Sequence, residues 1–196
     1  MTSIVPSRLL RCLLLPTLAC GTALVGSARD IRAQSDDDSD VNREYVIKAA
    51  YLYQFGRYVQ WPANAFASDG SPLVIGILGA DQFSSSLEKI ARTKRIDRRP
   101  IAVRRFASMA EYTPCHILFV SSSLSPEQKA VAIQKSQQSA LLLVGEEPGF
   151  AEQGGTVNFF LDENKIRFEI NMEIAKQDQL KISSKLLSLA KIVGRY

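Results

Sequence analysis

Histidine and cysteine, the residues on which many catalytic and metal sites depend, are scarce in this 196-residue chain. It has one histidine, His116, and three cysteines, Cys12, Cys20 and Cys115. One histidine beside one cysteine does not fill a zinc coordination shell, and no cluster of carboxylates resembles a calcium loop. Neighbouring side chains on a strand point to opposite faces, so Cys115 and His116 in "CHILFV" do not form a nucleophile pair. We therefore predict no metal site and a structural role for His116.

Motifs for cofactors and for acid–base chemistry are also absent. Gly76 and Gly79 end the apolar run "PLVIGILG" just before a helical segment, where an anion would fit. The fixed three-glycine frame of a dinucleotide site is missing, which favours an ordinary tight turn. Glu169 is the carboxylate considered as a general acid or base, and no second catalytic group accompanies it. We therefore predict a protein that is not an enzyme and binds no cofactor.

The amino-terminal 33 residues have the composition of an export signal. Arg8 and Arg11 precede or interrupt an apolar run over residues 9–25, which is too broken for a membrane span. Small residues precede two candidate cleavage points, after Ala28 and after Ala33. The mature protein is thus expected to be exported and not to span a membrane.

Removal of this leader changes the balance of charge. The full chain has 24 basic and 20 acidic residues, and these fall to 20 and 19 once the four basic and one acidic residues of 1–33 are removed. A near-neutral protein is a poor candidate for binding nucleic acid. Cys115 remains alone, which excludes an internal disulfide. The acidic stretch at residues 34–40, "QSDDDSD", predicts a disordered tether, and residues 41–196 are expected to form one domain.

Short apolar runs alternate with amphipathic segments along the mature chain. Strands are expected at residues 72–79, 100–106, 116–121 and 140–146. Residues 80–93 read as a helix with Asp81 as a possible N-cap, and Ser125 with Gln128 predicts a capping box on the next helix. The tail is expected to supply one or two closing helices. This pattern predicts an α/β fold: a mixed, mainly parallel sheet covered by helices on both faces, with a C-terminal antiparallel hairpin at one edge.

The register of that hairpin follows from the stretch "GGTVNFFLDENKIRFEIN", residues 154–171, when the turn is centred on Glu163 and Asn164. The apolar face then pairs Leu161 with Ile166, Phe159 with Phe168, and Val157 with Ile170. The polar face pairs Asp162 with Lys165, Phe160 with Arg167, and Asn158 with Glu169. We expect Asn158 and Glu169 to hydrogen-bond across the strands and Arg167 to lie over Phe160. This face is assigned a structural or ligand-contact role.

The first helix is expected over residues 41–60, ended by Trp61 and Pro62. Its apolar stripe is Tyr45, Ala49, Leu52 and Val59. Aromatic side chains surround more than one side of it: Tyr45, Tyr51, Tyr53, Phe55, Tyr58 and Trp61. Two readings remain open, an aromatic contact surface or a helix enclosed within its own domain. A homodimer that forms through the aromatic side chains is consistent with the reading of a contact surface.

A basic segment, "RTKRIDRRPIAVRR" at residues 92–105, has seven basic residues and one acidic residue. The simplest interpretation is a solvated rim that also protects a sheet edge. Docking to an acidic partner is the alternative, since export argues against nucleic acid.

Six motifs, in order over residues 45–193, resemble those of the YfiR family of exported α/β proteins. They are "IKAAYLYQFGRYVQWP", "IGILGADQF", "CHILFV", "PGFAEQGGTVNFF", "IRFEIN" and "LKISSKLLSLA". The resemblance implies a periplasmic repressor that holds an inner-membrane diguanylate cyclase inactive through its periplasmic sensor region. It also implies that an outer-membrane lipoprotein relieves this repression by sequestering the repressor. The motif positions carried over are Phe150, Gly154, Gly155, Asn158, Phe159, Phe168, Glu169, Ile170 and Asn171.

We therefore predict a homodimeric periplasmic regulator that inhibits such a cyclase and so lowers cyclic di-GMP and biofilm formation. The alternatives are an accessory sensor for a histidine kinase or a small-molecule-binding protein, with the glycine turns and the polar face of the hairpin as its pocket. Ten residues are predicted to contact the partner or ligand: Tyr45, Tyr51, Tyr53, Tyr58, Trp61, Asn158, Phe160, Arg167, Glu169 and Asn171.

Overall fold

A computed structural model describes residues 28–194 except 81 and 84, with side chains from Asn42 onward. Most of the predicted signal peptide, and Asp81, lie outside the described residues. The strands are β1 (Val59–Gln60), β2 (Leu73–Leu78), β3 (Ile101–Phe106), β4 (Ile117–Val120), β5 (Leu142–Gly145), β6 (Val157–Asp162), β7 (Lys165–Asn171), β8 (Lys181–Ile182) and β9 (Lys191–Val193). The helices are α1 (Ala28–Tyr58), the 3-10 turn η1 (Ala63–Ala65), α2 (Ser86–Thr93), α3 (Pro126–Ser136), α4 (Met172–Gln177) and α5 (Ser184–Leu187).

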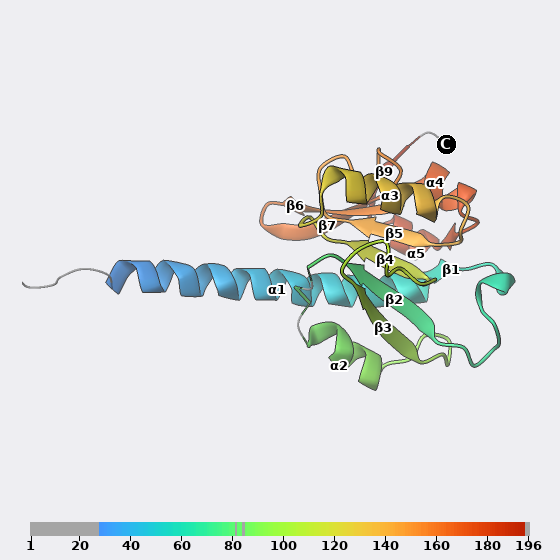
Figure 1. Cartoon of the computed structure of the whole chain (residues 1–196), viewed down its shortest axis with the longest axis horizontal. Coiled ribbons are helices and arrows are strands. Elements are labelled where there is room, and N and C mark those ends of the chain that lie inside the picture. The colour runs from blue at the N-terminus through green and yellow to red at the C-terminus, as the bar shows by residue number, and fades with distance from the viewer. Residues whose placement is uncertain (1–27, 81, 84, 195–196) are drawn as a thin grey trace, which may run out of the picture.

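Seven of these strands form one sheet in the order β3-β2-β4-β5-β6-β7-β9 (Figure 1). Neighbouring strands from β3 to β6 are parallel, β6 and β7 are antiparallel, and β9 joins β7 in parallel. The predicted α/β class with a mainly parallel sheet and an antiparallel hairpin is confirmed. The hairpin is not the edge of the sheet, however, because β9 covers the outer side of β7.

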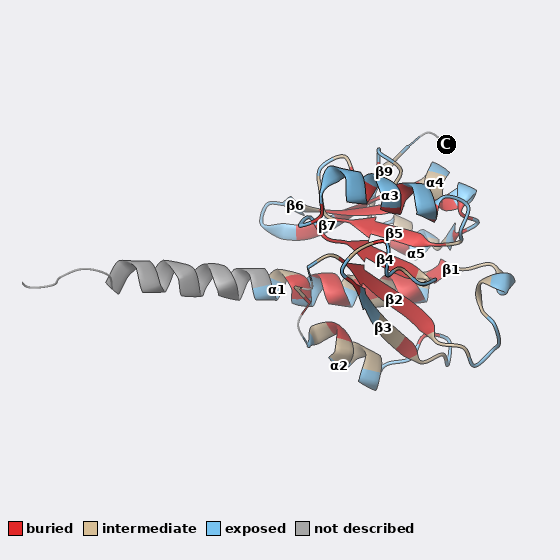
Figure 2. Ribbon diagram, viewed as in Figure 1, coloured by how far each residue is buried: buried red, intermediate tan, exposed pale blue. Residues whose placement is uncertain are grey.

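Helices pack on both faces of this sheet. One core joins α1, α2 and α5 to alternate strand residues such as Ile75 and Phe119, and the second core joins α3 to Leu118 and Leu143 on the opposite face. The alternation arises because successive strand residues point to opposite faces. In Figure 2 both faces of the central strands are buried, as expected for a sheet with two covered sides.

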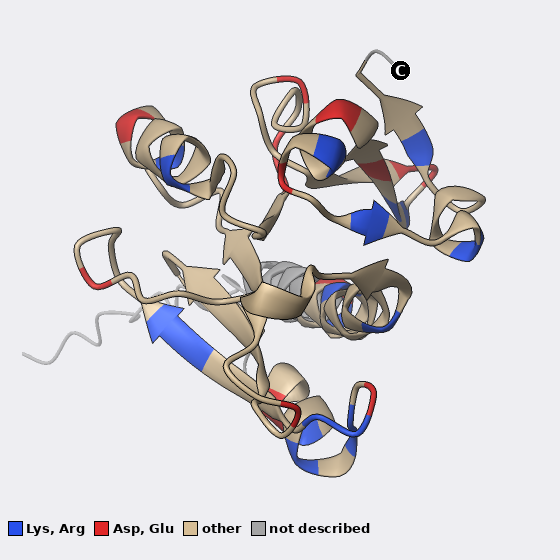
Figure 3. Cartoon of the chain, turned by 90° about the vertical axis from the view of Figure 1, so that its right-hand side faces the viewer, with Lys and Arg blue, Asp and Glu red and all other residues tan. Residues whose placement is uncertain are grey.

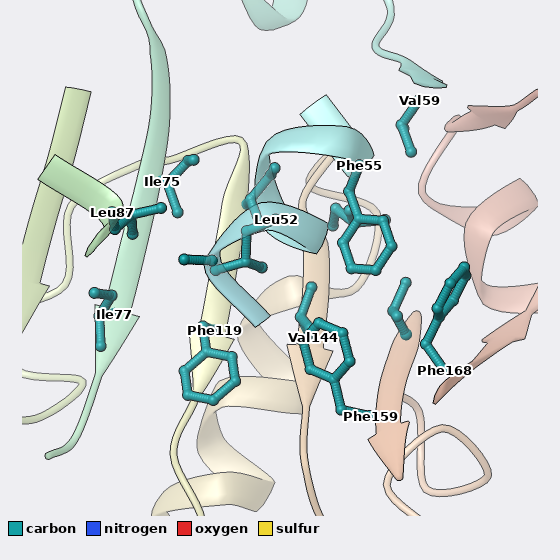
Figure 4. Packing of buried hydrophobic residues seen from close by; sticks show 14 of the residues in the cluster. Leu52, Phe55, Val59, Ile75, Ile77, Leu87, Phe119, Val144, Phe159 and Phe168 are labelled. Atoms are coloured by element: carbon teal, nitrogen blue, oxygen red, sulfur yellow. The ribbon is translucent and has the colours of Figure 1, made fainter. Parts of the chain in front are cut away.

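The first helix crosses the larger core. Its predicted stripe of Tyr45, Ala49, Leu52 and Val59 is buried, together with Phe55. Figure 4 shows the helix seated among the aromatic rings of the sheet. The helix begins at Ala28, so the backbone of residues 34–40 continues α1 where we expected a disordered tether. No proline or glycine occurs between Ala28 and Phe55 to interrupt the helix.

The hairpin has the predicted register. All six predicted pairs are present, from Val157 opposite Ile170 to Asp162 opposite Lys165. Glu163 and Asn164 have φ values of 48° and 58°. Two consecutive left-handed residues make the type I′ turn whose twist matches that of a two-stranded ribbon.

Helix ends depend on local caps, and one of the two predicted helix starts differs from expectation. Ser125 and Gln128 form the predicted capping box of α3. By contrast, α2 starts at Ser86 instead of near residue 80, with Ser85 at the cap position. The tail forms two short helices, as predicted, but also strands β8 and β9, and its Leu189 is 64% exposed.

Candidate functional site

The ten predicted contact residues do not gather on one surface. Tyr45, Asn158, Glu169 and Asn171 are all buried, with at most 7% of their area exposed. Their assignment as contact residues is corrected, because a partner cannot reach them without opening the fold. Arg167 remains exposed, but at a different place from the helix aromatics.

The aromatic side chains of α1 mainly serve the protein's own core. Tyr51, Tyr53, Tyr58 and Trp61 are half-buried and pack against the larger core. Tyr51 lies edge-on to Phe168, with ring centroids 5.2 Å apart. Of the two readings of this helix, the enclosed one holds for most of these rings, since α2, α5 and the hairpin flank it.

Strand β9 places Lys191 against the polar face of the hairpin, beside Glu169 and Phe160. The Asn158 amide donates to Glu169 Oε1 at 3.1 Å, which confirms the predicted cross-strand bond, and Lys191 Nζ of β9 donates to Glu169 Oε2 at 3.2 Å. The expected stacking of Arg167 on Phe160 is wrong. Arg167 pairs with Asp162 at 3.8 Å, and the Lys191 ammonium lies 5.8 Å from the Phe160 ring. The sequence did not predict β9, so its lysine was missed.

Residues 146–155 form the β5–β6 loop. The loop is held against the sheet by Phe150, whose ring packs between Gly145 and Gly155. A Cβ on either Gly145 or Gly155 would lie 2.3 Å from the ring of Phe150. Asn171 fixes the same loop, because its amide donates to the Ala151 carbonyl at 2.8 Å while its oxygen caps α4. Three of the motif positions carried over from the family resemblance, Phe150, Gly155 and Asn171, therefore have a structural role in shaping this loop.

The loop begins with Glu146, the centre of a buried polar network. Its carboxylate accepts from the Tyr45 hydroxyl at 2.9 Å, from Lys48 Nζ at 2.6 Å, and from the Ser122 N–H and hydroxyl at 2.9 Å each. Lys48 is also paired with Glu44 at 2.5 Å. The network joins α1 to the carboxyl ends of β4 and β5, although these segments are about a hundred residues apart in sequence.

Proton affinities in this network follow from its charges. Burial alone would raise the pKa of Glu146, but the Lys48 ammonium and the hydrogen bonds from Lys48 and Ser122 outweigh it and hold the pKa below its ordinary value. Burial, with the Glu146 charge next, raises the pKa of the Tyr45 phenol. The carboxylate thus stays ionised and the phenol stays a donor. The network therefore ties α1 to the start of the β5–β6 loop through partnered, buried groups.

Next to the network, α1 and the hairpin form an exposed apolar surface, which we call the α1–hairpin face. It comprises Leu161 of β6, exposed by 62%, and Ile47 of α1, exposed by 38% and one helical turn before Tyr51, whose ring contacts Phe168 of the hairpin. Between helix and hairpin lies a hollow of about 270 Å³ whose lining includes Leu161, Ile166 and the buried Lys48. Large exposed apolar side chains on a rigid support are typical of protein contact surfaces. The sequence prediction missed Ile47 and Leu161 because it gave weight to aromatic rings.

A larger groove of about 950 Å³ lies at the other end of α1, and we call it the β1–α4 groove. Its walls are the segment after α1, helix α4 and strand β8. Trp61, Met172 and Ile182 supply apolar surface, and Lys176 and Lys181 supply positive charge. A small-molecule pocket was predicted at the glycine turns and the polar hairpin face, and this groove lies elsewhere. Gly76 is closely packed, since a Cβ there would meet Leu118 and Phe106 at 2.9 Å.

His116 fixes the segment that follows β1, residues 61–66, against strands β2 and β4. Its Nδ1 accepts the Val74 N–H at 3.0 Å, so the proton is on Nε2, which donates to the Ala65 carbonyl at 3.1 Å. Phe66 stacks on the imidazole with centroids 4.3 Å apart, and the Trp61 indole N–H donates to the His116 carbonyl at 3.3 Å. The structural role predicted for His116 agrees with these contacts.

Acid is expected to weaken the fold through this histidine. Burial lowers the pKa of His116; the hydrogen bond to Ala65 opposes that effect, and the nearby Arg99 charge adds to it. The unfolded chain therefore binds a proton near pH 6.5 that the folded chain does not, so the free energy of unfolding falls as the pH drops below about 6.5. Denaturant titrations between pH 7.5 and pH 5 measure this loss.

The control for that titration is His116→Asn, whose side-chain oxygen can accept the Val74 N–H but does not titrate. Its stability should fall less than that of the wild type over the same range. Asp178 acts in the opposite direction, because burial raises its pKa from 3.8 to about 6, against the hydrogen bond from Gln138, and stability then rises as the pH falls below 6. Both proteins share Asp178, so their difference isolates His116. Parallel curves would exclude the histidine as the cause.

Neither a metal cluster nor a membrane span is found in the part of the chain that the structure describes. No group of three or more histidine, cysteine, aspartate or glutamate side chains among these residues is placed to hold a metal ion. No described helix is both long and apolar enough to cross a bilayer.

Comparison with known proteins gives one family. Residues 45–191 match the family described as YfiR/HmsC-like. A comparison with curated proteins finds no match. A solved structure, of an ABC domain in complex with L-Trp from Streptococcus pneumonia, is similar with a TM-score of 0.46 and 13% identity. The similarity covers 66% of this chain and 57% of that chain, and likeness at this level identifies no shared function.

Proposed function

Because the chain belongs to the YfiR/HmsC-like family, we propose that it is a periplasmic regulatory protein that inhibits an inner-membrane diguanylate cyclase. It binds the periplasmic sensor region of the cyclase and so lowers cyclic di-GMP and biofilm formation. An outer-membrane lipoprotein that sequesters it, and a homodimeric state, belong to the same proposal. The family match over residues 45–191 is the observation that carries it.

Inhibition by binding sets an energetic condition. The protein must bind the inactive arrangement of the sensor region more tightly than the active one, because equal affinity shifts no equilibrium. No substrate chemistry is required, which agrees with the fully partnered state of Glu146 and the structural bonds of His116.

The α1–hairpin face is the surface we propose for this contact. It combines the exposed Ile47 and Leu161 with a hollow that can receive a partner side chain. The buried network of Lys48 and Glu146 holds the helix and the loop beside the hairpin in fixed positions. A rigid apolar surface loses little conformational entropy on binding, which favours a specific complex.

Charge placed on this face should release the cyclase. In cells that lack the chromosomal gene, we expect Ile47→Glu with Leu161→Glu to leave cyclic di-GMP high, because a buried carboxylate in the contact costs binding at least tenfold. Leu189→Glu is the matched control, since Leu189 is 64% exposed but lies between α5 and β9. It should restore the low level given by the wild type. Equal repression by both variants, at equal periplasmic abundance, contradicts the assignment of this face.

A second candidate function, binding of a small molecule, is favoured by the size of the β1–α4 groove. The groove lies within the range of ordinary ligand sites at about 950 Å³. Trp61, the single tryptophan of the chain, lines it, so an occupant would change the intrinsic fluorescence. A metabolite screen read by that fluorescence tests this function, and an absence of any shift or thermal stabilisation counts against it.

A further inference from the structure

Four exposed cations lie on the last turn of α2 and on the segment that joins it to β3, a stretch that we call the basic turn. They are Arg92, Lys94, Arg95 and Arg98, and all four are exposed. No ion pair involves them among the described residues, whereas Arg105 of the adjacent strand is paired with Glu88. Figure 3 shows basic residues concentrated in this part of the molecule. Unpaired cations held together raise the local positive potential.

The backbone that carries these cations is anchored on both sides. Ile96, at 2% exposure, packs onto α1 so closely that a Cβ on Gly56 would lie 2.4 Å from its Cδ1. Ile96 and Arg99 bridge each other across the turn. Arg99 donates to the carbonyls of Ser68 and Ser71 at 2.6 and 3.1 Å and lies 3.9 Å from the Phe66 ring. The turn is therefore a rigid projection.

Its tip also adopts an unfavourable backbone. Asp97 and Arg98 have φ values of 47° and 70°, in the left-handed region that glycine and asparagine occupy at lower cost. A long side chain such as that of arginine is less favourable at such a position than glycine or asparagine. These two residues close the turn between the bridged Ile96 and Arg99, but that turn does not require a long cationic side chain at its tip.

Beside the turn lies a concavity that suits a polypeptide. It measures about 650 Å³ and its lining includes Trp61, Phe66, Arg98 and the carboxylates Asp69 and Asp97. A chain segment can enter such a hollow, whereas a bilayer surface is flat. The large exposed apolar side chains of the described residues all lie elsewhere, so the turn has none of them to insert into lipid.

We propose that the basic turn is a docking surface for an acidic polypeptide segment of the regulated partner. Carboxylates of that segment pair with Arg95 and Arg98, and its backbone follows the adjacent hollow. The contact adds orientation and a faster, salt-dependent association to the apolar contact at the α1–hairpin face. This inference rests on the proposed function, because it states the chemistry of the partner surface.

Charge reversal tests the docking in cells. In a strain that lacks the chromosomal gene, Arg95→Glu with Arg98→Glu should leave cyclic di-GMP close to the level of the deletion. Lys135→Glu with Lys185→Glu makes the same change in net charge on exposed lysines outside the turn and outside the α1–hairpin face, and should restore repression. If deletion itself leaves cyclic di-GMP unchanged, the proposed function fails. If deletion raises cyclic di-GMP and the Arg95→Glu, Arg98→Glu variant still lowers it, only the docking inference is overturned.

A second variant separates docking from folding. Arg98→Asn fits the left-handed backbone, so the melting temperature should not fall, yet repression should weaken because a cation is lost. A fluorescein-labelled decaglutamate serves as the probe of the turn. Its dissociation constant should rise about tenfold or more in the double reversal and should rise with added salt in the wild type. Unchanged affinity of the double reversal for this probe contradicts the inference.

A membrane surface is the competing partner for any basic projection. Sedimentation with phosphatidylglycerol vesicles, against phosphatidylcholine vesicles, measures it. We expect no binding above the phosphatidylcholine level at physiological salt. Binding to phosphatidylglycerol that the double reversal abolishes, together with unchanged affinity for decaglutamate, would assign the turn to lipid and overturn the polypeptide assignment.

Discussion

Replacement of Glu146 by alanine is expected to lower the free energy of unfolding by about 3 to 5 kcal/mol, because it leaves a buried lysine without its main partner. The Lys48 side chain is 5% exposed and would keep only Glu44, whose side chain is 29% exposed. The Ser122 N–H and the Tyr45 hydroxyl would lose their acceptor as well. Urea denaturation followed by circular dichroism gives the change.

The control is Glu152→Ala in the same loop, an exposed glutamate expected to change stability by less than about 0.5 kcal/mol. The lowered pKa of Glu146 adds a pH dependence. Its contribution is complete above the ordinary carboxyl value of 4.5 and is lost as the pH falls through the folded value. Glu146→Ala should therefore lose less stability than the wild type on acidification through that range. Equal stability of wild type and Glu146→Ala at pH 7 is incompatible with a stabilising network.

Phe150→Ala is expected to cost about 3 to 5 kcal/mol, the usual loss for a fully buried phenylalanine. The ring belongs to the smaller core with Ile133 and Leu143, and it fills the space above Gly145 and Gly155. Its removal frees the loop that begins with Glu146, so repression in cells should fall together with stability. Thermal and urea unfolding of the purified mature protein measure the effect.

A double-mutant cycle tests the fit between ring and glycine. Gly155→Ala alone should cost about 1 to 3 kcal/mol, because its Cβ would enter the Phe150 ring, but much less in the Phe150→Ala background, where that space is empty. Gly70→Ala is the control, since a Cβ there meets nothing within 4 Å. Additive costs in the cycle would show that ring and glycine do not compete for the same space.

Local patterns in the sequence were sufficient for the hairpin and for most strands. The alternation of Phe159 and Phe168 with polar neighbours admits one register, and the turn residues Glu163 and Asn164 agree with it. The capping box of Ser125 with Gln128 needs only four consecutive residues. In each case the contacts that determine the structure are close in sequence.

Long-range contacts explain what the sequence did not reveal. Lys48 lies on the buried side of α1, where a lysine requires a counter-charge, but its partner Glu146 is 98 residues away. The burial of Tyr45 and Glu169 also depends on long-range contacts. Tyr45 bonds to Glu146, and Glu169 bonds to Lys191 of β9, a strand that was not predicted. Lysine in an apolar helical stripe was the signal available in the sequence, and it indicated a partner without identifying one.

The cyclic di-GMP content of cells with and without the gene tests the central claim most directly. Mass spectrometry of nucleotide extracts should show a rise after deletion and a return to the original level when the wild-type gene is supplied on a plasmid. An unchanged pool after deletion, in cells shown to export the protein and to contain a membrane diguanylate cyclase with a periplasmic region, would contradict a role as its inhibitor.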